Sequence, residues 1–405
     1  MLAILATHPV PYQVPVWKAL GRDGRVPFEV WYLTHHGVNA SFDGGFGKTF
    51  AWDIDLLSEY NSRLLSNGPT VLPDGFMALR LDKCFRQMLR GKRVKALWIQ
   101  GWQVRAYWEA VWQARAEGIQ VWLRGESNDL APSSFIKKYL KKVLLGQLFR
   151  RVDNFLYIGK ANRRLYESYD ILPEKLHPAP YCADNRRFAQ QAKLLLPRRA
   201  HIRKTWKIPE EAFCVLFVGK FIPKKRPLDL VSAARSTLIK KMKAPLHLVF
   251  TGSGELGDQL RANCNVLFDA ESPAPAEKIT NSNGLPSASF VGFLNQTEIS
   301  KAYVAADCMV LPSDHGETWG LVVNEALASG LPCAVSSRVG CGEDVVATMN
   351  PRLRFGLGDI EGLANALLEL NSQRYSREDA QAQVEKYNTE ATVDTVVKLY
   401  HQGKK

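Results

Sequence analysis

The chain lacks the sequence features of a membrane-spanning, disulfide-stabilised or P-loop protein. No apolar run among its 405 residues approaches the length that crosses a bilayer. The apolar N-terminal run of residues 1–5 is interrupted at His8-Pro9, which does not fit a secretory signal. Neither a P-loop motif nor the full dinucleotide-binding fingerprint is present. The cysteines are odd in number and lack paired metal spacing, so we expect reduced core residues in a cytoplasmic protein: Cys84, Cys182, Cys214, Cys264, Cys308, Cys333 and Cys341.

The excess of positive over negative charge lies entirely in the first half of the chain. Residues 1–200 hold 30 Lys and Arg against 17 Asp and Glu, a net charge of +13, whereas residues 201–405 hold 23 of each sign. We therefore expect the two halves to face different partners. A basic first half suits anionic lipid headgroups, an acidic or phosphorylated substrate, or nucleic acid.

Short apolar strands alternate with helical patterns along the whole sequence. This alternation predicts two parallel α/β domains, since 405 residues exceed one ordinary core. We expect an N-terminal domain over residues 1–185, a second over 186–375 and a final helical segment over 376–405, with a Pro-rich linker within 171–200. Strands are expected at 2–6, 28–33, 96–100, 120–124, 155–158, 214–219, 246–250, 290–293, 308–312 and 333–335. Residues 37–93 show no regular pattern, residues 270–286 resemble a surface loop, and residues 378–400 are expected to form one helix.

One segment of the first half combines apolar and basic residues at helical spacing. Residues 133–151, SSFIKKYLKKVLLGQLFRR, place four lysines between apolar positions. One interpretation is a core helix with a solvated basic face. The other is a helix that contacts an anionic membrane surface.

The stretch Pro312–Ala326 carries two glutamates, Glu317 and Glu325, and follows a predicted strand. Exposed helix carboxylates are common, and a glycosidase-like acid–base pair is another interpretation. That second chemistry gives no role to Lys220 and Lys225, which follow an earlier strand and could neutralise a diphosphate. With those lysines, the glutamates fit acceptors of hydrogen bonds from sugar or ribose hydroxyls.

Three further motifs are weaker. Gly252-Ser253-Gly254 after a strand is often only a tight turn. Asp53-Ile54-Asp55 resembles a metal-binding DxD motif, but the match is three residues long and lies outside the second half. His8 follows the first strand, where a substrate contact and a packing role are both reasonable.

The second half resembles the retaining glycosyltransferases of family four, which have the GT-B fold. The matching motifs, in order and spacing, are Gly219-Lys220-x4-Lys225, Thr251-Gly252-Ser253-Gly254, Val291-Gly292-Phe293, and Pro312-Ser313-x3-Glu317-x2-Gly320-Leu321-x3-Glu325-Ala326-x3-Gly330-x-Pro332. The resemblance implies two Rossmann-like doubly wound domains that face each other across a cleft. It also implies a C-terminal helix that crosses back to the N-terminal domain.

Residue roles carry over from this resemblance. Lys220 and Lys225, behind Gly219, would bind the donor diphosphate and stabilise charge on the leaving nucleotide. Glu317 would contact the donor sugar and Glu325 the ribose. The remaining positions implied for donor binding are Gly252, Phe293, Leu294, Thr318, Trp319, Gly320 and Leu321. Neither a metal nor another cofactor is expected, and no catalytic base is named because the leaving phosphate would help to deprotonate the acceptor.

The N-terminal half departs from the family, and it would shape the acceptor site. His8, Tyr12 and Glu126 are the candidate contacts there. The resemblance predicts sugar transfer from a UDP- or GDP-type donor to a glycan or to a lipid-linked or phosphorylated acceptor, with peripheral contact at the inner membrane face. A GT-B phosphorylase, a nucleotide-sugar hydrolase, a basic nucleic-acid-binding protein and an inactive scaffold remain alternatives.

Overall fold

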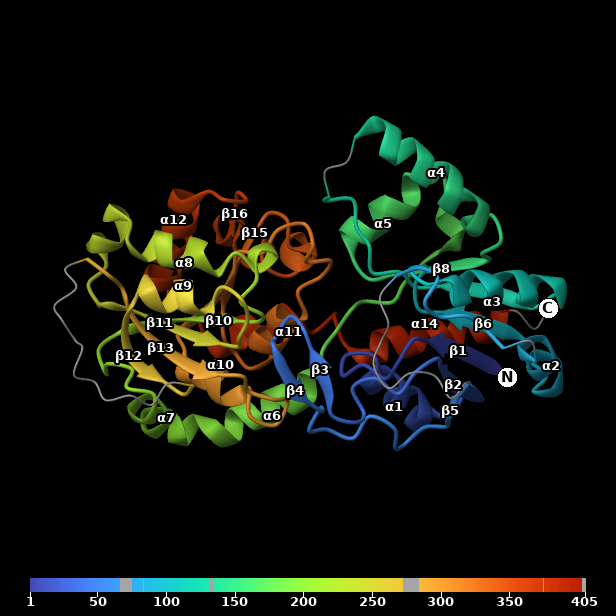
Figure 1. Ribbon diagram of the computed structural model, residues 1–405, viewed down its shortest axis with the longest axis horizontal. Helices are drawn as coiled ribbons and strands as arrows, with labels where there is room; N and C mark the ends of the chain where they lie inside the picture. Colours follow the sequence, from blue (N-terminus) through green and yellow to red (C-terminus); the bar gives the residue numbers. More distant parts are fainter. Residues whose placement is uncertain (66–74, 83, 132–133, 272–283, 374, 403–405) are drawn as a thin grey trace. The chain divides into compact units, whose positions relative to one another are not determined.

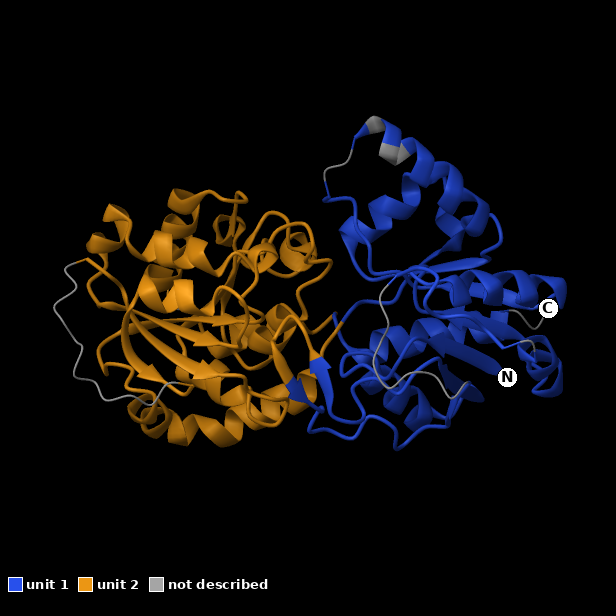
Figure 2. Ribbon diagram, in the orientation of Figure 1, with its two compact units in different colours: residues 1–42, 49–181, 387–405 blue, residues 43–48, 182–386 orange. Residues whose placement is uncertain are grey.

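The computed structural model describes residues 1–65, 75–82, 84–131, 134–271, 284–373 and 375–402. The chain divides into two compact units, coloured separately in Figure 2. Unit 1 comprises residues 1–42, 49–181 and 387–405, and unit 2 comprises residues 43–48 and 182–386. The expected ranges were 1–185, 186–375 and 376–405, and the main difference lies near the start of the chain. A short segment of the first half, residues 43–48, belongs to the second unit.

Unit 1 is built on a seven-stranded sheet in the order β5-β2-β1-β6-β7-β8-β9, and its neighbouring strands are parallel. Strand β1 lies inside the sheet, where Ile4 pairs with Val30 on one side and Trp98 on the other. The strands are β1 (Leu2–Ala6), β2 (Phe28–Tyr32), β5 (Ser62–Leu64), β6 (Ala96–Ile99), β7 (Gln120–Leu123), β8 (Asn154–Tyr157) and β9 (Leu176–Pro178). Residues of β1 and β6 are buried throughout, as expected where helices cover both faces of a parallel sheet.

The helices of unit 1 follow its strands in a doubly wound pattern (Figure 1). They are α1 (Val14–Asp23), α2 (Phe85–Gly91), α3 (Arg105–Ala116), α4 (Phe135–Phe149), α5 (Lys160–Glu167), η1 (Pro173–Lys175) and α14 (Thr389–Gln402). The last of these packs on α1, so the end of the chain belongs to the same unit as its beginning. Four fully buried tryptophans fill the core: Trp17, Trp31, Trp98 and Trp122.

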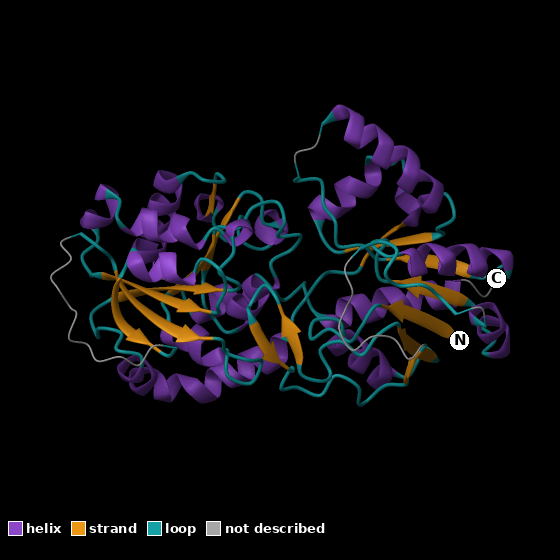
Figure 3. Ribbon diagram, viewed as in Figure 1, coloured by secondary structure: helices purple, strands orange, loops and turns teal. Residues whose placement is uncertain are grey.

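Unit 2 contains a second seven-stranded parallel sheet, in the order β12-β13-β11-β10-β14-β15-β16. Its strands are β10 (Phe213–Val218), β11 (Leu246–Thr251), β12 (Asn265–Asp269), β13 (Ser287–Gly292), β14 (Cys308–Leu311), β15 (Cys333–Ser336) and β16 (Arg354–Phe355). Figure 3 shows helices on both sides of these strands. The two parallel sheets therefore bear out the α/β architecture with two Rossmann-like units that the sequence predicts.

The helices of unit 2 form two contacting groups, one on each side of the sheet (Figure 1). One group is α8 (Pro227–Ala234), α9 (Gly257–Ala262) and α12 (Ile360–Gln373). The other is α6 (Asn185–Leu195), α7 (Arg199–Thr205), α10 (Ser300–Ala305) and α11 (Leu321–Ala328), and α13 (Arg377–Ala382) packs on α11. The 3₁₀ turns are η2 (Leu196–Arg198), η3 (Pro223–Lys225), η4 (Thr237–Lys241), η6 (Gly340–Glu343) and η7 (Pro351–Leu353).

The boundary between the two units falls between residues 181 and 182, within the Pro-rich segment 171–200 that was predicted to hold the linker. The same segment also contains helix α6, because Phe188 and Ala192 bury one face of that helix. One prediction of local structure was wrong. The single helix predicted over residues 378–400 is two helices, α13 and α14. The side chain of Asn388 accepts a hydrogen bond from the amide of Ala391 at 2.8 Å and so caps the start of a new helix.

Six short strands were not predicted. Four of them, β5, β9, β12 and β16, are the edge strands of the two sheets, and each has only two to five residues without a long apolar run. Strands β3 (Ser41–Asp43) and β4 (Lys48–Phe50) form a separate two-stranded hairpin within the region that showed no pattern. The surface loop predicted over 270–286 falls mostly outside the described residues.

Candidate active site

The predicted donor-site loops of unit 2 follow four adjacent parallel strands. Gly219 follows β10, Gly252 follows β11, Phe293 follows β13, and the segment beginning at Pro312 follows β14. Because these strands run in the same direction and are neighbours in the sheet, all four loops emerge at one edge of it. Ligands of open α/β sheets bind at this edge, outside the carboxyl ends of the strands.

Two glycines allow these loops to pack backbone against backbone. A Cβ atom added to Gly252, whose φ is +132°, would lie 2.0 Å from the carbonyl oxygen of Gly219. A Cβ atom added to Gly340 would lie 1.8 Å from the carbonyl oxygen of Thr318. No larger residue fits at either position without moving the backbone. The loops after β10 and β11, and the segment after β14, are therefore held at distances that only glycine permits.

Lys225 and Glu317 form an ion pair between the loops after β10 and β14. Lys225 ends the η3 turn, and the side chains of the two residues are only 17% and 16% exposed. The two loops are also joined through their backbones, because the amide of Asp314 donates to the carbonyl of Lys224 at 2.8 Å. The structure thus brings together one lysine and one glutamate that the sequence predicted to share a site.

Lys220 has a partner that the sequence did not predict. Its Nζ atom lies 2.8 Å from Oδ1 and 2.9 Å from Oδ2 of Asp43, and 4.9 Å from the centre of the Phe46 ring. Phe46 in turn contacts Phe293, with ring centres 5.0 Å apart and planes at 72°. Asp43 and Phe46 belong to the hairpin tip, residues 43–48, which is part of unit 2. The only sequence signal was Asp43-Gly44-Gly45, which is typical of a turn but says nothing about its partner.

Glu325 lies in α11 and is almost fully buried, with 1% of its surface exposed. Its Oε2 atom accepts a hydrogen bond from the hydroxyl of Tyr303, on α10, at 2.5 Å. A buried carboxylate requires such a partner, and this contact fixes the side chain. The structure places Glu325 in the helix that follows Glu317, and its assignment to ribose stays a prediction. Tyr303 was not identified from the sequence.

The segment between the two glutamates is shaped by its backbone. Gly320, with φ +98°, precedes the first residue of α11, Leu321. Trp319 points into the protein, since it is 2% exposed and its Nε1–H donates to Asn324 at 2.8 Å. Thr318 and Leu294 are partly exposed. Trp319 can therefore reach a ligand only through its main chain, and its assignment to donor binding stays a prediction.

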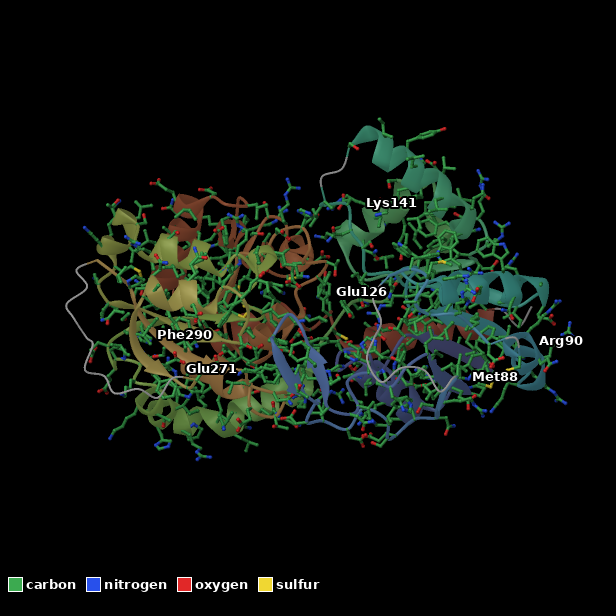
Figure 4. The ribbon with its side chains drawn as sticks, in the orientation of Figure 1. Met88, Arg90, Glu126, Lys141, Glu271 and Phe290 are labelled. Atoms are coloured by element: carbon green, nitrogen blue, oxygen red, sulfur yellow. The ribbon has the colours of Figure 1, made fainter. Side chains whose placement is uncertain are left out.

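The three candidate acceptor residues of unit 1 follow strands β1 and β7. His8 and Tyr12 lie after β1, and Glu126, labelled in Figure 4, lies after β7. Since unit 1 also has a parallel sheet, these loops share its carboxyl edge. Burial, with a smaller effect of His36, lowers the pKa of His8 to about 4, so His8 is neutral at pH 7.

Tyr181, which the sequence analysis missed, contacts one of the acceptor candidates. Its hydroxyl donates to Oε1 of Glu126 at 2.6 Å, and the guanidinium of Arg124 lies 4.9 Å from its ring centre. Burial raises the pKa of Tyr181 well above its ordinary value, and Glu126 and Tyr12 add to that effect. Glu126 is thus held by a buried phenol at the carboxyl edge of the unit 1 sheet.

Other features of the structure do not coincide with this chemistry. A hollow of about 1330 Å³ in unit 2 is lined by residues at the amino ends of strands, such as Phe213 and Asp307, and by none of the predicted donor residues. We give it less weight, because ligands of such sheets gather at the carboxyl ends.

The candidate metal motif forms a local turn instead, in which Asp55 accepts hydrogen bonds from the amides of Leu57 and Ser58. Within the described residues, no cluster of three or more metal-ligating side chains occurs, and no helix is long and apolar enough to span a membrane.

Six of the seven cysteines are buried, and all seven are free thiols. Burial raises the pKa of the Cys214 and Cys264 thiols to about 12. Thiols in such surroundings are inert, which agrees with the core role that the sequence predicted.

Comparison with known proteins identifies the second unit. Residues 198–389 match the family described as glycosyl transferases group 1. The sulfoquinovosyl transferase of Arabidopsis thaliana is 37% identical over 120 residues, which are 28% of this chain and 23% of that protein. A D-inositol 3-phosphate glycosyltransferase of Thermomonospora curvata is 27% identical over 249 residues, or 60% of this chain and 55% of that protein. The chain therefore spans from about a quarter to about half of the length of these two relatives.

Solved structures extend the likeness to the whole chain. A protein from Anabaena, crystallised in complex with UDP and glucose, superposes with a TM-score of 0.61 at 13% identity and covers 99% of both chains. At that identity the likeness shows the fold alone. Residues 198–389, which make up most of the second unit, thus match the glycosyl transferases group 1 family, and the two parallel sheets of the chain have the GT-B glycosyltransferase fold.

Proposed function

We propose that this chain transfers a sugar from a UDP- or GDP-type nucleotide sugar to an acceptor bound by unit 1. The observation that carries the proposal is the ion pair of Lys225 with Glu317, in which Lys225 belongs to the same loop as Lys220. Two ammonium groups and a carboxylate at the carboxyl edge of the sheet suit the two ends of a sugar diphosphate. The family match over residues 198–389 supports the same assignment.

Each side chain would have one task. Lys220 and Lys225 would neutralise the diphosphate and stabilise the charge that develops on the leaving nucleotide. Glu317 would accept hydrogen bonds from sugar hydroxyls, and Glu325 from ribose hydroxyls. The lysines supply positive charge where other transferases use a metal, so we propose that transfer needs neither a metal nor another cofactor.

We further propose that transfer retains the anomeric configuration. The acceptor would attack on the same face that the nucleotide leaves, and the departing phosphate would take the acceptor proton. This leaves the glutamates free to bind hydroxyls rather than to exchange protons. Comparison of the product anomer with the donor anomer by NMR tests this point, and an inverted product would contradict it.

A thermal-shift panel of nucleoside diphosphates and their sugars tests donor binding. A ligand at 100 times its Kd stabilises the native state by about 2.7 kcal/mol, which is a readily measured rise in Tm. We expect one base to raise the Tm, and the rise to disappear in Lys220→Ala and Glu317→Ala. Absence of any shift from nucleotides, together with tight and salt-sensitive RNA binding, would favour the nucleic-acid alternative. Phosphate-dependent glycan cleavage would favour a phosphorylase, and release of free sugar from the nucleotide sugar without an acceptor would favour a hydrolase.

We propose that the acceptor is a phosphorylated or lipid-linked glycan at a membrane surface. Helix α4 supports this proposal, since five of its large apolar side chains are 51–70% exposed: Ile136, Tyr139, Leu140, Val143 and Leu144. Lys141, labelled in Figure 4, and Lys142 lie among them in the sequence, as do Lys137 and Lys138. Apolar residues alternating with lysines fit an anionic bilayer better than a neutral protein surface. Similarity to a D-inositol 3-phosphate glycosyltransferase is consistent with a phosphorylated acceptor.

Co-sedimentation with liposomes tests the membrane proposal. We expect binding to vesicles that contain an anionic lipid at low salt, and loss of binding in Ile136→Ser/Leu140→Ser/Val143→Ser and in Lys137/Lys138/Lys141/Lys142→Ala. Leu194→Ser is the matched control, because Leu194 is 76% exposed on α6 of unit 2. Equal sedimentation of all variants would refute a role for α4, and concentration-dependent dimerisation lost in the serine variant would show that a second copy covers this face.

A further inference from the structure

The hairpin tip, residues 43–48, presents a carboxylate to the lysine that the proposed function assigns to the donor diphosphate. Asp43 holds Lys220 Nζ with both of its oxygens, at 2.8 and 2.9 Å. An oxygen pair at hydrogen-bond distance from an ammonium group is also what a phosphate would offer there. The negative group on Lys220 in this structure is thus a part of the protein itself.

The tip is held in place by contacts that do not involve Lys220 or Asp43. Ser253 donates its hydroxyl to the carbonyl of Phe46 at 2.7 Å, and the Phe46 ring packs on Phe293. Lys48 pairs with Glu271, which Figure 4 labels in unit 2. These contacts span several loops of the unit 2 sheet, so the position of Asp43 is fixed independently of its charge.

The turn within the tip orients the carboxylate. Oδ1 of Asp43 accepts from the amides of Gly45 and Phe46 at 2.9 and 3.0 Å, and the amide of Gly47 donates to the Asp43 carbonyl at 2.8 Å. Burial favours the neutral acid, but the hydrogen bonds from Lys220 and from the two amides outweigh it and lower the pKa of Asp43 below its ordinary value. Asp43 therefore carries its negative charge at neutral pH.

Both lysines of the proposed donor site are therefore paired with carboxylates of the protein itself. Lys225 pairs with Glu317 and Lys220 with Asp43, and the four side chains are between 16% and 31% exposed. A diphosphate must replace or share these carboxylates before it gains the full attraction of the lysines. A nucleoside without phosphates does not have to do so.

Resting on the proposed function, we infer that Asp43 sets the affinity and specificity of the donor site by competing with the donor diphosphate for Lys220. Its effect is confined to the charged part of the ligand. Weakly charged ligands gain too little to displace the carboxylate, whereas a diphosphate gains contacts with both lysines. Asp43 is thus a specificity-determining residue that the N-terminal half of the sequence contributes to the nucleotide unit.

Asp43→Asn is the variant that isolates the charge. The amide side chain keeps an oxygen for the Gly45 and Phe46 amides, so the turn is preserved. We expect the Kd for the nucleoside diphosphate that the wild type prefers to fall by about three- to tenfold, because removal of a like charge near a bound anion relieves repulsion. The Kd for the corresponding nucleoside should not change. Glu210→Gln removes the same charge at the amino end of β10 and is the matched control.

Isothermal titration of UDP, GDP, uridine and guanosine into the full-length proteins gives these constants. Unchanged or weaker diphosphate binding in Asp43→Asn, with a wild-type Tm, would overturn the inference, and so would an equal change for the nucleoside. If the wild type binds none of the diphosphates, the proposed function itself fails. The two failures are therefore distinguishable.

Discussion

Replacement of Lys225 by methionine is the sharpest test of the site, because it keeps the side-chain stem and removes only the charge. Lys225 is 17% exposed and pairs with Glu317. A hydrogen bond to a charged group contributes about 1.5–3 kcal/mol. Since about 1.4 kcal/mol corresponds to a tenfold change in an equilibrium constant, we expect the Kd for the preferred nucleoside diphosphate to rise by about 10- to 100-fold.

The same substitution leaves a carboxylate without its ion-pair partner. We therefore expect Lys225→Met and Glu317→Gln each to lower the free energy of unfolding by about 1–2 kcal/mol, and the double variant to lose less than the sum. Urea unfolding of the four proteins gives the coupling energy. Lys224→Met is the matched control, since Lys224 is exposed in the same loop. Additive losses, or a Lys224 variant that weakens nucleotide binding as strongly as the Lys225 variant, would refute the assignment.

Three other predictions concern ribose recognition, loop packing and pH. Glu325→Gln should weaken binding of the ribonucleoside diphosphate but hardly change binding of its 2′-deoxy analogue, and equal losses for both would exclude ribose contact. Gly252→Ala should cost roughly 3 kcal/mol in urea unfolding, because the new Cβ would lie 2.0 Å from a carbonyl, whereas Gly118→Ala, at positive φ with open space, should cost about 1 kcal/mol. His247, whose pKa is lowered to about 4 mainly by burial, should make the wild type less stable as the pH falls from 6.5 towards 4, because the unfolded chain binds the proton first. The difference corresponds to about 3 kcal/mol, and His247→Gln, measured over the same pH range, should show a shallower slope.

Much of unit 2 could be predicted because its signals are local. Strands β10, β11 and β14 are short, mostly apolar runs, and they are followed at once by Gly219, Gly252 and Pro312, which begin loops. The parallel arrangement then brings Lys225 and Glu317 to one edge, although 91 residues separate them in the sequence. Alternation of strands and helices was therefore sufficient to predict the architecture and this pair.

The hairpin tip could not be predicted, because its role depends on a long-range contact. Asp43 and Lys220 are far apart in the sequence, and the tip has neither an apolar run nor a helical period. Tyr303 and Tyr181 were missed for a related reason. A buried tyrosine resembles any other core aromatic residue until the carboxylate that its hydroxyl contacts is known.

The break between α13 and α14 was missed for a local reason. Asn388 is a good helix N-cap, but it lies in a segment whose composition otherwise favours a continuous helix. Helix α4 was correctly predicted as a helix. Its Leu145, Leu148 and Phe149 are buried in the core, whereas Leu140 and Leu144 are exposed. Contact of the exposed part with a membrane stays a prediction.

The most direct test of the account is the rate of nucleoside diphosphate release from the matching nucleotide sugar. The measurement compares the wild type, Glu317→Gln and the control Glu210→Gln, each with and without acceptor. The account predicts that acceptor accelerates release by the wild type and that the control is unchanged. It predicts that Glu317→Gln is slower by about 10- to 100-fold, because the side chain loses charged hydrogen bonds to the sugar hydroxyls. Full activity in Glu317→Gln would contradict the placement of the donor sugar at the carboxyl edge of unit 2.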